Sequence, residues 1–426
     1  MVPCRRSLVV VHFSILLLAG ITSGADDGRV TAGDPVDLAT GINIREHDDI
    51  VVHGEPKIDL HRTFAGGWPR AGAFGIGASH SYDLFLAAES EKAKEEVRRL
   101  YLIHPKGWRF PFVRTSPGTG HTGAVLMHEG TPSAFHGARL SWNGAGWDLD
   151  LVNGSRYSFP PCDGAVVRPE QCALRGYRDG QGRSILLDRD PNGELRSVSA
   201  GWRRRINFRY DSAHRIVRAD TGWGLSMTTV DYAYDAGGRL ASVKSRQLSV
   251  WTVLFELIYA YETMHLPSLD RMSVRYDAEY TYDERHRLRR VREPGLELDH
   301  EYDAAGRVIR QDVTGWGSWT FTYTQGADGR VAQTDLVSPD GLHRRVILNA
   351  DGYVLSDATA PGRPEERVTL YERVPGGNVI ARITVECRSV VGTPVSVAAP
   401  VGQEPHEAVE ARLHNQCGKP EAASNR

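Results

Sequence analysis

This sequence of 426 residues lacks a large net charge of either sign. Its 51 Lys and Arg residues nearly balance its 53 Asp and Glu residues, so the formal net charge is −2. A chain without a basic excess lacks the long-range attraction that binds phosphate backbones or anionic membranes. The composition therefore predicts no nucleic-acid partner.

Short motifs that usually carry metal, cofactor or nucleophile chemistry are missing as well. The sequence has no C-x-x-C pair, no H-E-x-x-H motif, no Walker loop and no nucleophile elbow. Residues 118–123 satisfy G-x-G-x-x-G, but they follow Pro117 in a loop-like stretch and open no helix, so they predict no dinucleotide site. We expect no catalytic residue, no cofactor and no metal site, and hence no enzyme activity.

Long uncharged runs are rare, and the first one lies at the N-terminus. A basic start precedes the apolar run Leu8–Leu18, and small residues follow it up to Ala25. This order is typical of a secretory signal peptide over residues 1–25, with a mature chain that begins near Asp26 and does not insert into the membrane. An uncleaved anchor is the alternative, but the run is shorter than the roughly 20 residues that span a bilayer.

Cysteine is scarce, with five residues in the whole chain. Loss of a signal peptide would remove Cys4 and leave an even number, which in an exported protein predicts two disulfides. Proximity in the sequence favours the pairs Cys162 with Cys172 and Cys387 with Cys417. The alternative is that these cysteines are unpaired.

The sequence does contain a short internal repeat. From about residue 174 to residue 355 it returns to one pattern: alternating aromatic residues, Asp or Asn, two variable residues, Gly, Arg and an aliphatic residue. Its signature residues are Tyr210, Asp211, Tyr234, Asp235, Gly238, Arg239, Tyr282, Asp283, Arg287, Tyr302, Asp303, Gly306, Arg307, Tyr323, Gly329 and Arg330. We assign residues 166–385 to this repeat region.

The Asp-x-x-Gly part of the repeat predicts a tight turn. In the sequence Asp-Pro-Asn-Gly at 190–193, Asp caps a type I turn, Pro supplies a fixed φ and Gly193 takes the left-handed conformation. This geometry is typical of a hairpin with a bulge after the turn. His214 and His286 replace Gly in two copies, and His is among the residues enriched at positive φ, so both are interpreted as turn residues.

Aromatic residues alternate ahead of each turn, as in Phe208 with Tyr210. A spacing of two places both rings on one face of a strand. Each repeat is therefore predicted to be a β-hairpin that buries its aromatic face against its neighbours, in one coiled antiparallel sheet of an all-β protein. One ring of each pair is expected to form a row along this sheet, made of Tyr234, Tyr282, Tyr302 and Tyr323.

Three further segments differ from the repeats. Residues 26–165 contain short strands separated by turn residues and predict a small N-terminal β domain. The apolar stretch Val250–Tyr261 is interpreted as a buried strand pair because of its β-branched and aromatic residues. Residues 386–426 are rich in Pro, Ala, Val and Glu and predict a poorly ordered tail.

The Tyr-Asp-x-x-Gly-Arg recurrence resembles the YD repeats of bacterial Rhs proteins, of wall-associated proteins and of the animal teneurins. Its clearest copies are 232–240 and 302–308. Residues 33–41 and 74–83 are similar to the segment that precedes the repeats in many Rhs chains. The resemblance covers about residues 33–355. It implies a long β-sheet coiled into a hollow shell, often around a C-terminal toxin, with carbohydrate binding in some members.

The sequence departs from that family pattern in three respects. It has fewer repeats than a closed shell needs, so the resemblance implies an open part of such a shell. It shows no core-closing segment or self-cleaving aspartyl motif near residue 426, and it leaves too few residues for a toxin domain. It also begins with a signal peptide, whereas many Rhs effectors leave the cell through a contractile injection device.

These features together predict a secreted or periplasmic bacterial scaffold that binds glycan or protein and has no catalytic activity. Exposed Tyr and Trp rings would stack on sugars, and Arg would bond to hydroxyl or acid groups. One alternative is an orphan or truncated toxin-delivery fragment that lacks its toxin. Another is a glycan-acting enzyme, because a fold alone does not assign a function.

Overall fold

The computed structural model describes most of the chain beyond residue 29. The described residues are 30–66, 70–88, 96–131, 133–162, 168–223, 226–248, 254, 257–258, 273–374, 378–388, 394–401 and 406–417. The predicted signal peptide lies outside these ranges.

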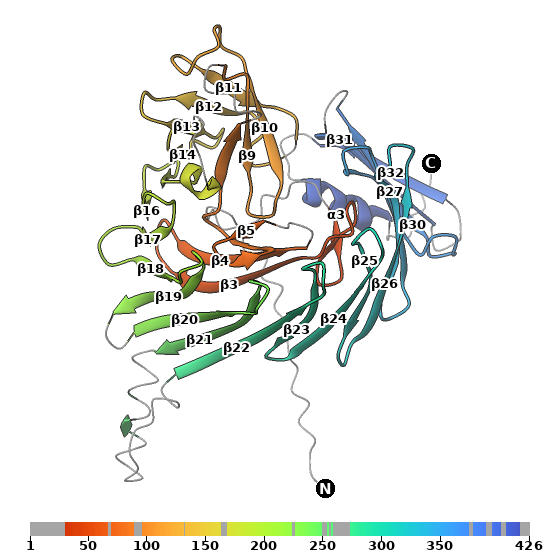
Figure 1. The fold of residues 1–426 in the computed structure, drawn as a ribbon. Coiled ribbons are helices and arrows are strands. Elements are labelled where there is room, and N and C mark those ends of the chain that lie inside the picture. Colours follow the sequence, from red (N-terminus) through yellow and green to blue (C-terminus); the bar gives the residue numbers. More distant parts are fainter. Residues whose placement is uncertain are drawn as a thin grey trace.

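Most of the described chain forms one large antiparallel sheet of 25 strands, β8 to β32, in which each strand pairs with the next in sequence. No pairing joins β32 to β8 within the described ranges, so the sheet is open. Figure 1 shows how the sheet curves into an arc around the N-terminal part of the chain. The all-β class and the coiled antiparallel sheet predicted from the repeats are therefore confirmed.

The first half of this sheet consists of short strands. They are β8 (Phe85–Ala88), β9 (Arg99–Ile103), β10 (Arg109–Arg114), β11 (Val125–His128), β12 (Ala138–Trp142), β13 (Trp147–Asp150), β14 (Arg156–Phe159), β15 (Gly176–Arg178), β16 (Ser184–Arg189), β17 (Leu195–Ser199), β18 (Arg205–Tyr210) and β19 (Ile216–Trp223).

The second half contains longer strands. They are β20 (Ser226–Tyr234), β21 (Leu240–Leu248), β22 (Ser273–Tyr282), β23 (Leu288–Glu293), β24 (Leu296–Tyr302), β25 (Val308–Val313), β26 (Gly317–Gln325), β27 (Val331–Val337), β28 (His343–Leu348), β29 (Val354–Thr359), β30 (Arg367–Arg373), β31 (Ile380–Arg388) and β32 (Pro394–Pro400).

The sheet does not break at residue 165, where the sequence predicts the end of an N-terminal β domain. Strand β14 pairs with β15 across that position, and the described residues of the connection include a short 3₁₀ helix, η2 (Pro169–Cys172). Strands β8–β14 therefore share their hydrogen-bonded sheet with the repeats. Local strand and turn patterns cannot reveal this continuity, because they do not say which strands pair.

The Asp-x-x-Gly turns close the hairpins as the sequence predicts. Gly193, Gly238 and Gly306 have φ of 87°, 77° and 89°, while His214 and His286 have φ of 63° and 62°. The register shifts beside these turns, for example between Glu301 and Tyr302 in the β24–β25 pair, which is the expected bulge.

The N-terminal segment, residues 30–84, lies on the concave side of the sheet. Figure 1 shows two of its strands, β3 and β4, inside the arc of β16 to β25. Its strands are β1 (Thr31–Ala32), β2 (Val36–Asp37), β3 (Ile44–Val52), β4 (Ile58–Ala65), β5 (Ala71–Gly72), β6 (Gly75–Ile76) and β7 (Ala78–His80), of which β3, β4 and β7 form a small sheet.

At the bulges, some main-chain amides have no partner within the sheet. These amides donate to the N-terminal segment instead. The amide of Ile216 donates to the carbonyl of Ala73 at 2.7 Å, and the amide of Val308 donates to the carbonyl of Gly41 at 2.8 Å. A Cβ on Gly41 would lie 2.4 Å from Cβ of Arg307. Glycine at this position therefore permits the backbone to approach the repeats closely.

The tail predicted to be poorly ordered instead forms β32 and a helix, α3 (His406–Cys417). Val409 and Leu413, one turn apart on this helix, pack against Ile383 and Val385 of β31. The correction has a physical cause: two apolar side chains at a spacing of four suffice to dock a short helix once a sheet face is available.

The stretch Val250–Tyr261 differs from the predicted buried strand pair at its described positions. Leu254, Leu257 and Ile258 are helical, and 45–48% of each residue's surface is exposed. Apolar composition favoured burial, but the hairpin made by β21 and β22 closes at Leu248 and Ser273, before this stretch can join the sheet.

The two predicted disulfides have different outcomes. Cys162 and Cys172 are both buried, but no disulfide joins them; the Cys162 thiol instead donates to the carbonyl of Cys172 at 3.8 Å. The pairing predicted from their proximity is therefore wrong. Cys387 does belong to a disulfide, and its pairing with Cys417 stays a prediction, because that side chain lies outside the described part.

Within the described ranges, α-helices are too short or too polar to span a lipid bilayer.

Candidate functional site

The signature residues of the repeat build the sheet, and Tyr282, Asp283, Arg287 and Tyr302 also line an open, mainly polar depression of about 560 Å³. At Asp303, one carboxylate oxygen accepts the amide of Arg307 at 2.9 Å and the other accepts its guanidinium at 2.7 Å. The same two contacts recur at Asp211, Asp235 and Asp283. Each Asp thus fixes both the turn and the Arg that follows it.

Each of these Arg side chains then contacts the Tyr of the next repeat. The guanidinium carbon of Arg287 lies 4.4 Å from the ring centroid of Tyr302, whose hydroxyl donates to the carbonyl of Leu288 at 2.6 Å. The equivalent pairs, which together form the Tyr–Arg row, are Arg215 with Tyr234, Arg239 with Tyr282, and Arg307 with Tyr323.

Among the signature residues, Tyr210, Gly329 and Arg330 belong neither to the Asp–Arg contacts described above nor to the Tyr–Arg row. The Tyr210 hydroxyl accepts the amide of Leu195 at 3.1 Å, and Gly329 and Arg330 close the β26–β27 turn with an Arg side chain that is 66% exposed. The contacts of the repeat signature therefore serve the architecture, and the larger groove lies elsewhere.

A groove of about 830 Å³ opens near the C-terminal end of the sheet, between β25–β30 and α3. This volume lies in the range of small-molecule sites. One half of the lining is apolar and the other half is polar. The apolar half includes Trp316, Trp319, Leu336 and Leu342. The polar half includes Arg344, Asp357, Arg367, Thr369, Glu410 and His414.

Strand register explains why charged side chains line this groove. Leu336 is in register with Arg344, Arg344 with Thr359, and Thr359 with Arg367. Directly opposed residues share a face of the sheet. Because Leu336 is buried on the concave face, the Arg and Thr side chains of this row point to the same side.

Ion pairs and hydrogen bonds hold the polar half in place. Arg344 Nε donates to Asp357 at 2.9 Å, and the Tyr371 hydroxyl donates to Glu410 of α3 at the same distance. Burial opposes the charge of Arg344, but the Asp357 carboxylate outweighs it and raises the pKa of Arg344 above its usual value. Burial and the Glu410 carboxylate raise the pKa of Tyr371 well above its usual value.

Sequence reasoning named no residue of this groove. A signal was present, since Arg344 and Asp357 occupy concave-facing positions of strands where earlier repeats have aromatic or aliphatic residues. The contribution of Glu410 and His414 had no such signal. Their place in the groove depends on the docking of α3, which lies far away in sequence.

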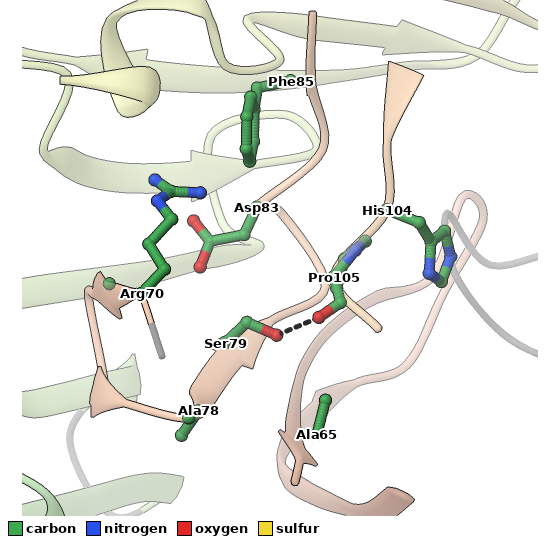
Figure 2. Close-up of a pocket in the computed structure, with 10 residues that line it drawn as sticks. Ala65, Arg70, Ala78, Ser79, Asp83, Phe85, His104 and Pro105 are labelled. Atoms are coloured by element: carbon green, nitrogen blue, oxygen red, sulfur yellow. Dashed lines mark hydrogen bonds between the residues drawn. The ribbon is translucent and has the colours of Figure 1, made fainter. Parts of the chain in front are cut away.

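A second cavity, near the start of the sheet, is far smaller. Figure 2 shows Arg70, Asp83 and Phe85 on one side of it, with His104 and Pro105 on the other. Its volume of about 30 Å³ holds one or two water molecules, which is too little for an organic ligand. The groove is therefore the better candidate site.

The concave face also carries a buried polar cluster where β3 and β4 meet the repeats. Arg62 donates to both carboxylate oxygens of Asp49 at 2.9 Å and to the Tyr280 hydroxyl at 3.0 Å. The Tyr232 hydroxyl donates to Asp49 at 2.8 Å. Burial opposes the charge of Asp49, yet the Arg62 guanidinium holds the pKa of this carboxyl far below its usual value.

Every strong donor of this buried cluster has a partner, and Arg62 has no exposed surface. The cluster therefore joins the N-terminal segment to the repeats and leaves no room for a ligand. Among the described side chains, no group of three His, Cys, Asp or Glu residues is arranged to hold a metal ion.

Comparison with known proteins gives a family model and a curated relative. Residues 33–112 match the family described as "Domain of unknown function (DUF6531)". The chain is 22% identical over 365 residues to "Probable deoxyribonuclease RhsA" of Dickeya dadantii (strain 3937), which covers 85% of this chain and 21% of that protein. The chain thus spans about a fifth of the length of this relative.

Solved structures give weaker similarities. The crystal structure of TcdB2-TccC3-Cdc42 matches 82% of this chain and 23% of its own, with 11% identity and a TM-score of 0.34. The crystal structure of TcdB2-TccC3 matches 88% of this chain and 24% of its own chain, with 12% identity and a TM-score of 0.23. Scores this low do not establish a shared fold, so the fold described above depends on the strand pairing itself.

Proposed function

Because the chain belongs to the Rhs/YD-repeat family, we propose that it is a binding scaffold and that the groove beside α3 holds a glycan. The observation that carries this proposal is the composition of the groove, with two Trp residues on one side and a row of charged and hydroxyl side chains on the other.

The two halves of the groove suit the two kinds of surface that a sugar ring presents. Trp316 is 75% exposed, so its ring is accessible to the apolar face of a sugar. Arg344 and Arg367 supply donors for hydroxyl groups, and Asp357 and Glu410 supply acceptors.

Charge balance favours an uncharged ligand. Arg344 and Arg367 are matched by Asp340, Asp357 and Glu410, and the Arg344–Asp357 pair is already satisfied. A polyanion would meet three carboxylates and a polycation would meet two guanidinium groups, so each would meet like charges. A neutral oligosaccharide meets neither obstacle.

The test is binding of neutral oligosaccharides of about four to six sugars, with sulfated and sialylated glycans on the same array for comparison. We expect neutral glycans to bind, and Trp316→Ala to weaken binding about tenfold without lowering the melting temperature, because this ring is mostly exposed. Trp202→Ala is the matched control, since Trp202 is 84% exposed on a different connection. Equal affinities for both variants would contradict the proposal.

Secretion is a separate part of this proposal. The N-terminal order of basic, apolar and small residues supports export to the periplasm or the medium. Mass spectrometry of the exported protein should find an N-terminus near Asp26. An intact Met1 on exported protein would favour the uncleaved anchor instead.

A second proposal is that the chain corresponds to one part of a toxin-delivery protein. It is favoured by the match to only a fifth of the curated relative and by the open sheet. The relative's name mentions a deoxyribonuclease, but the described residues offer no metal-binding cluster for such chemistry. Further repeats in the downstream reading frame would support this proposal over the independent scaffold.

A further inference from the structure

The apolar half of the groove extends beyond its two Trp rings. Trp319 opposes Gln311 in the β25–β26 pair, and Val313, two residues further along β25, lies on the same face of the sheet. Phe321, two residues after Trp319, opposes Leu336, so Leu336 lies diagonal to the Trp319 ring. Val313, Trp319 and Leu336 all line the groove. Aliphatic side chains therefore flank one of the two rings across three strands.

Leu342 adds an exposed apolar side chain to the same half. It lines the groove from the connection between β27 and β28 and is 44% exposed. This connection lies against the one that carries Trp316, because a Cβ on Gly317 would lie 3.0 Å from Cβ of Pro339. A hexose stacked on the Trp316 ring presents hydroxyl groups at its edge, and hydroxyl groups gain nothing from contact with a leucine. A plain hexose polymer therefore leaves Leu342 without a partner.

Asp340, two residues before Leu342, has a free acceptor. Its Oδ1 accepts the Ser338 hydroxyl and the amide of Leu342, the latter at 3.3 Å. Within the described part of the chain, no donor bonds to its Oδ2. The hydrogen bond from Ser338 holds the pKa of Asp340 below its usual value, so the carboxylate is ionised at neutral pH and acts only as an acceptor.

Arg344, two residues after Leu342, has a free donor. Its Nε and Nη2 donate to Asp357 at 2.9 and 2.5 Å. Among the described residues, no acceptor bonds to its Nη1. Residues two apart on a strand share a face, and both Leu342 and Arg344 line the groove. The unused donor therefore lies beside the leucine.

An acceptor, an apolar contact and a donor thus follow one another at residues 340, 342 and 344. An acetamido group presents the complementary set, which is an N–H, a methyl group and a carbonyl. We propose that the glycan held in this groove carries N-acetylamino groups, as in an oligomer of N-acetylglucosamine. Asp340 accepts the acetamido N–H, Leu342 contacts the methyl group and Arg344 donates to the carbonyl. This inference rests on the proposed glycan function and adds the class of sugar.

The acetamido group also agrees with the charge balance of the groove, because it is neutral. A hydroxyl group at the same position of the sugar has no methyl group for Leu342. A free amino group has neither the methyl group nor the carbonyl, and its ammonium form would meet the Arg344 guanidinium. Of these three substituents, acetamido is the one that engages all three side chains.

The experiment is isothermal titration calorimetry of the full-length protein with three tetrasaccharides that share one backbone. Cellotetraose has a hydroxyl group where chitotetraose has an acetamido group, and deacetylated chitotetraose has a free amino group. We expect chitotetraose to bind about tenfold more tightly than either of the others, because a buried methyl group and paired polar atoms discriminate to this degree. The comparison uses the unchanged protein, so it does not depend on the folding of any variant.

Variants then assign the preference to its residues. Leu342→Ser should weaken chitotetraose binding about tenfold and cellotetraose binding much less, because it removes the contact with the methyl group. Trp316→Ala should weaken both ligands by the same factor, since this ring stacks on the sugar itself. Ile347→Ser is the matched control and should change neither affinity, because Ile347 is 40% exposed on the opposite face of β28.

The possible failures are distinguishable. Equal affinities for chitotetraose and cellotetraose would overturn this inference and leave the glycan function intact, whereas absence of binding by every glycan would overturn the proposed function itself. Tighter binding of the deacetylated tetramer would mean that Asp340 attracts an ammonium group, which contradicts the inference. Displacement of chitotetraose by an equal concentration of N-acetyl-trialanine amide would also overturn it, because the groove would then recognise a peptide amide.

Discussion

The concave face of the sheet is covered by residues 30–84 along β18–β25, and Val36 and Leu38 extend this cover to Val346 and Leu348 of β28. The face is open at the groove, at the end of β28–β30 that carries Arg344 and Arg367. In the covered part, rings such as Phe208, Tyr232 and Tyr280 point inward, and Phe74 and Phe64 of the N-terminal segment lie 4.7 and 4.8 Å from the latter two. In the open part the inward positions hold Arg344, Asp357, Thr359 and Arg367.

The turns and strands are alike in the two parts, so the hairpin framework does not decide whether the face is covered. The inward side chains decide it. Aromatic rings gain free energy when another apolar surface removes them from water, at about 25 cal/mol per Å². Charged side chains lose hydration under such a cover, which explains why the N-terminal segment does not extend over them.

The largest expected effect is at Arg62 in the covered part. Arg62→Ala leaves the Asp49 carboxylate buried without its partner, so the free energy of unfolding should fall by about 3–5 kcal/mol in urea denaturation. Arg344→Ala in the open part should cost about 1 kcal/mol or less, because its side chain is 26% exposed.

A double variant sharpens this contrast. Arg62→Met/Asp49→Leu removes both charges and should recover most of the lost stability. If Arg62→Ala and Arg344→Ala lowered the free energy of unfolding equally, burial under the N-terminal segment would not determine the energy of these ion pairs.

The next effect concerns the Tyr–Arg row, which runs through the covered part. Tyr302→Ala should lower the free energy of unfolding by about 3 kcal/mol and unfold neighbouring repeats together. Tyr302→Phe, which removes only the hydroxyl that donates to Leu288, should cost about 1 kcal/mol. Arg310→Ala, at an exposed position, is the silent control. Separate unfolding transitions in the Tyr302→Ala variant would contradict a cooperative row.

Three histidines make the fold sensitive to acid: His80 and His300 on the covered side, and His104 near the start of the sheet. Burial lowers the pKa of His80 and of His300 to about 4 and that of His104 to about 3. The folded protein thus prefers the neutral rings, whereas the unfolded chain binds protons near pH 6.5. Their contribution to stability is complete above about pH 6.5 and is lost as the pH falls toward 4.

The measurement is the urea midpoint at several pH values between 7.5 and 4.5. We expect little change between pH 7.5 and 6.5 and a decrease below pH 6.5, with a smaller decrease in His300→Gln, which keeps a polar side chain but does not titrate. A midpoint that stays constant between pH 6.5 and 5 would show that these rings are protonated in the folded protein.

The smallest expected effect concerns the hairpin turns, which the covered and open parts of the sheet have in common. Gly306 turns a hairpin of the covered part and Gly329 turns β26–β27 beside the groove, with φ of 89° and 78° and no close contact at either Cβ position. Gly306→Ala and Gly329→Ala should each lower stability by about 1 kcal/mol, because Ala is strained at positive φ. Ala305→Ser should have little effect. A large difference between the two Gly variants would mean that the turns are not equivalent.

Much of the local structure could be predicted from residue patterns. The turn at Asp303 to Gly306, the bulge after it and the inward direction of Tyr302 depend on groups within a few residues of each other. The recurrence of one hairpin pattern also predicts a sheet in which each strand pairs with the next. These features follow from backbone sterics and side-chain alternation, which act over short distances in the chain.

Contacts between distant segments could not be predicted in this way. Arg62 bonds to Tyr280, 218 residues away, and Asp34 bonds to Gln311, 277 residues away. The groove depends on α3, whose docking onto β31 was missed, and the Cys162–Cys172 disulfide was predicted from proximity alone.

The sequence by itself therefore determined the hairpin, its turn and the faces of its strands. Only the tertiary structure decided that residues 30–84 cover one part of the concave face, that the sheet continues through residue 165, and that the groove stays open. The physical reason is that coiling of the whole sheet sets which distant surfaces meet. The coiling is the total of small twists between neighbouring strands over 25 strands, and this total cannot be predicted from any short stretch of sequence.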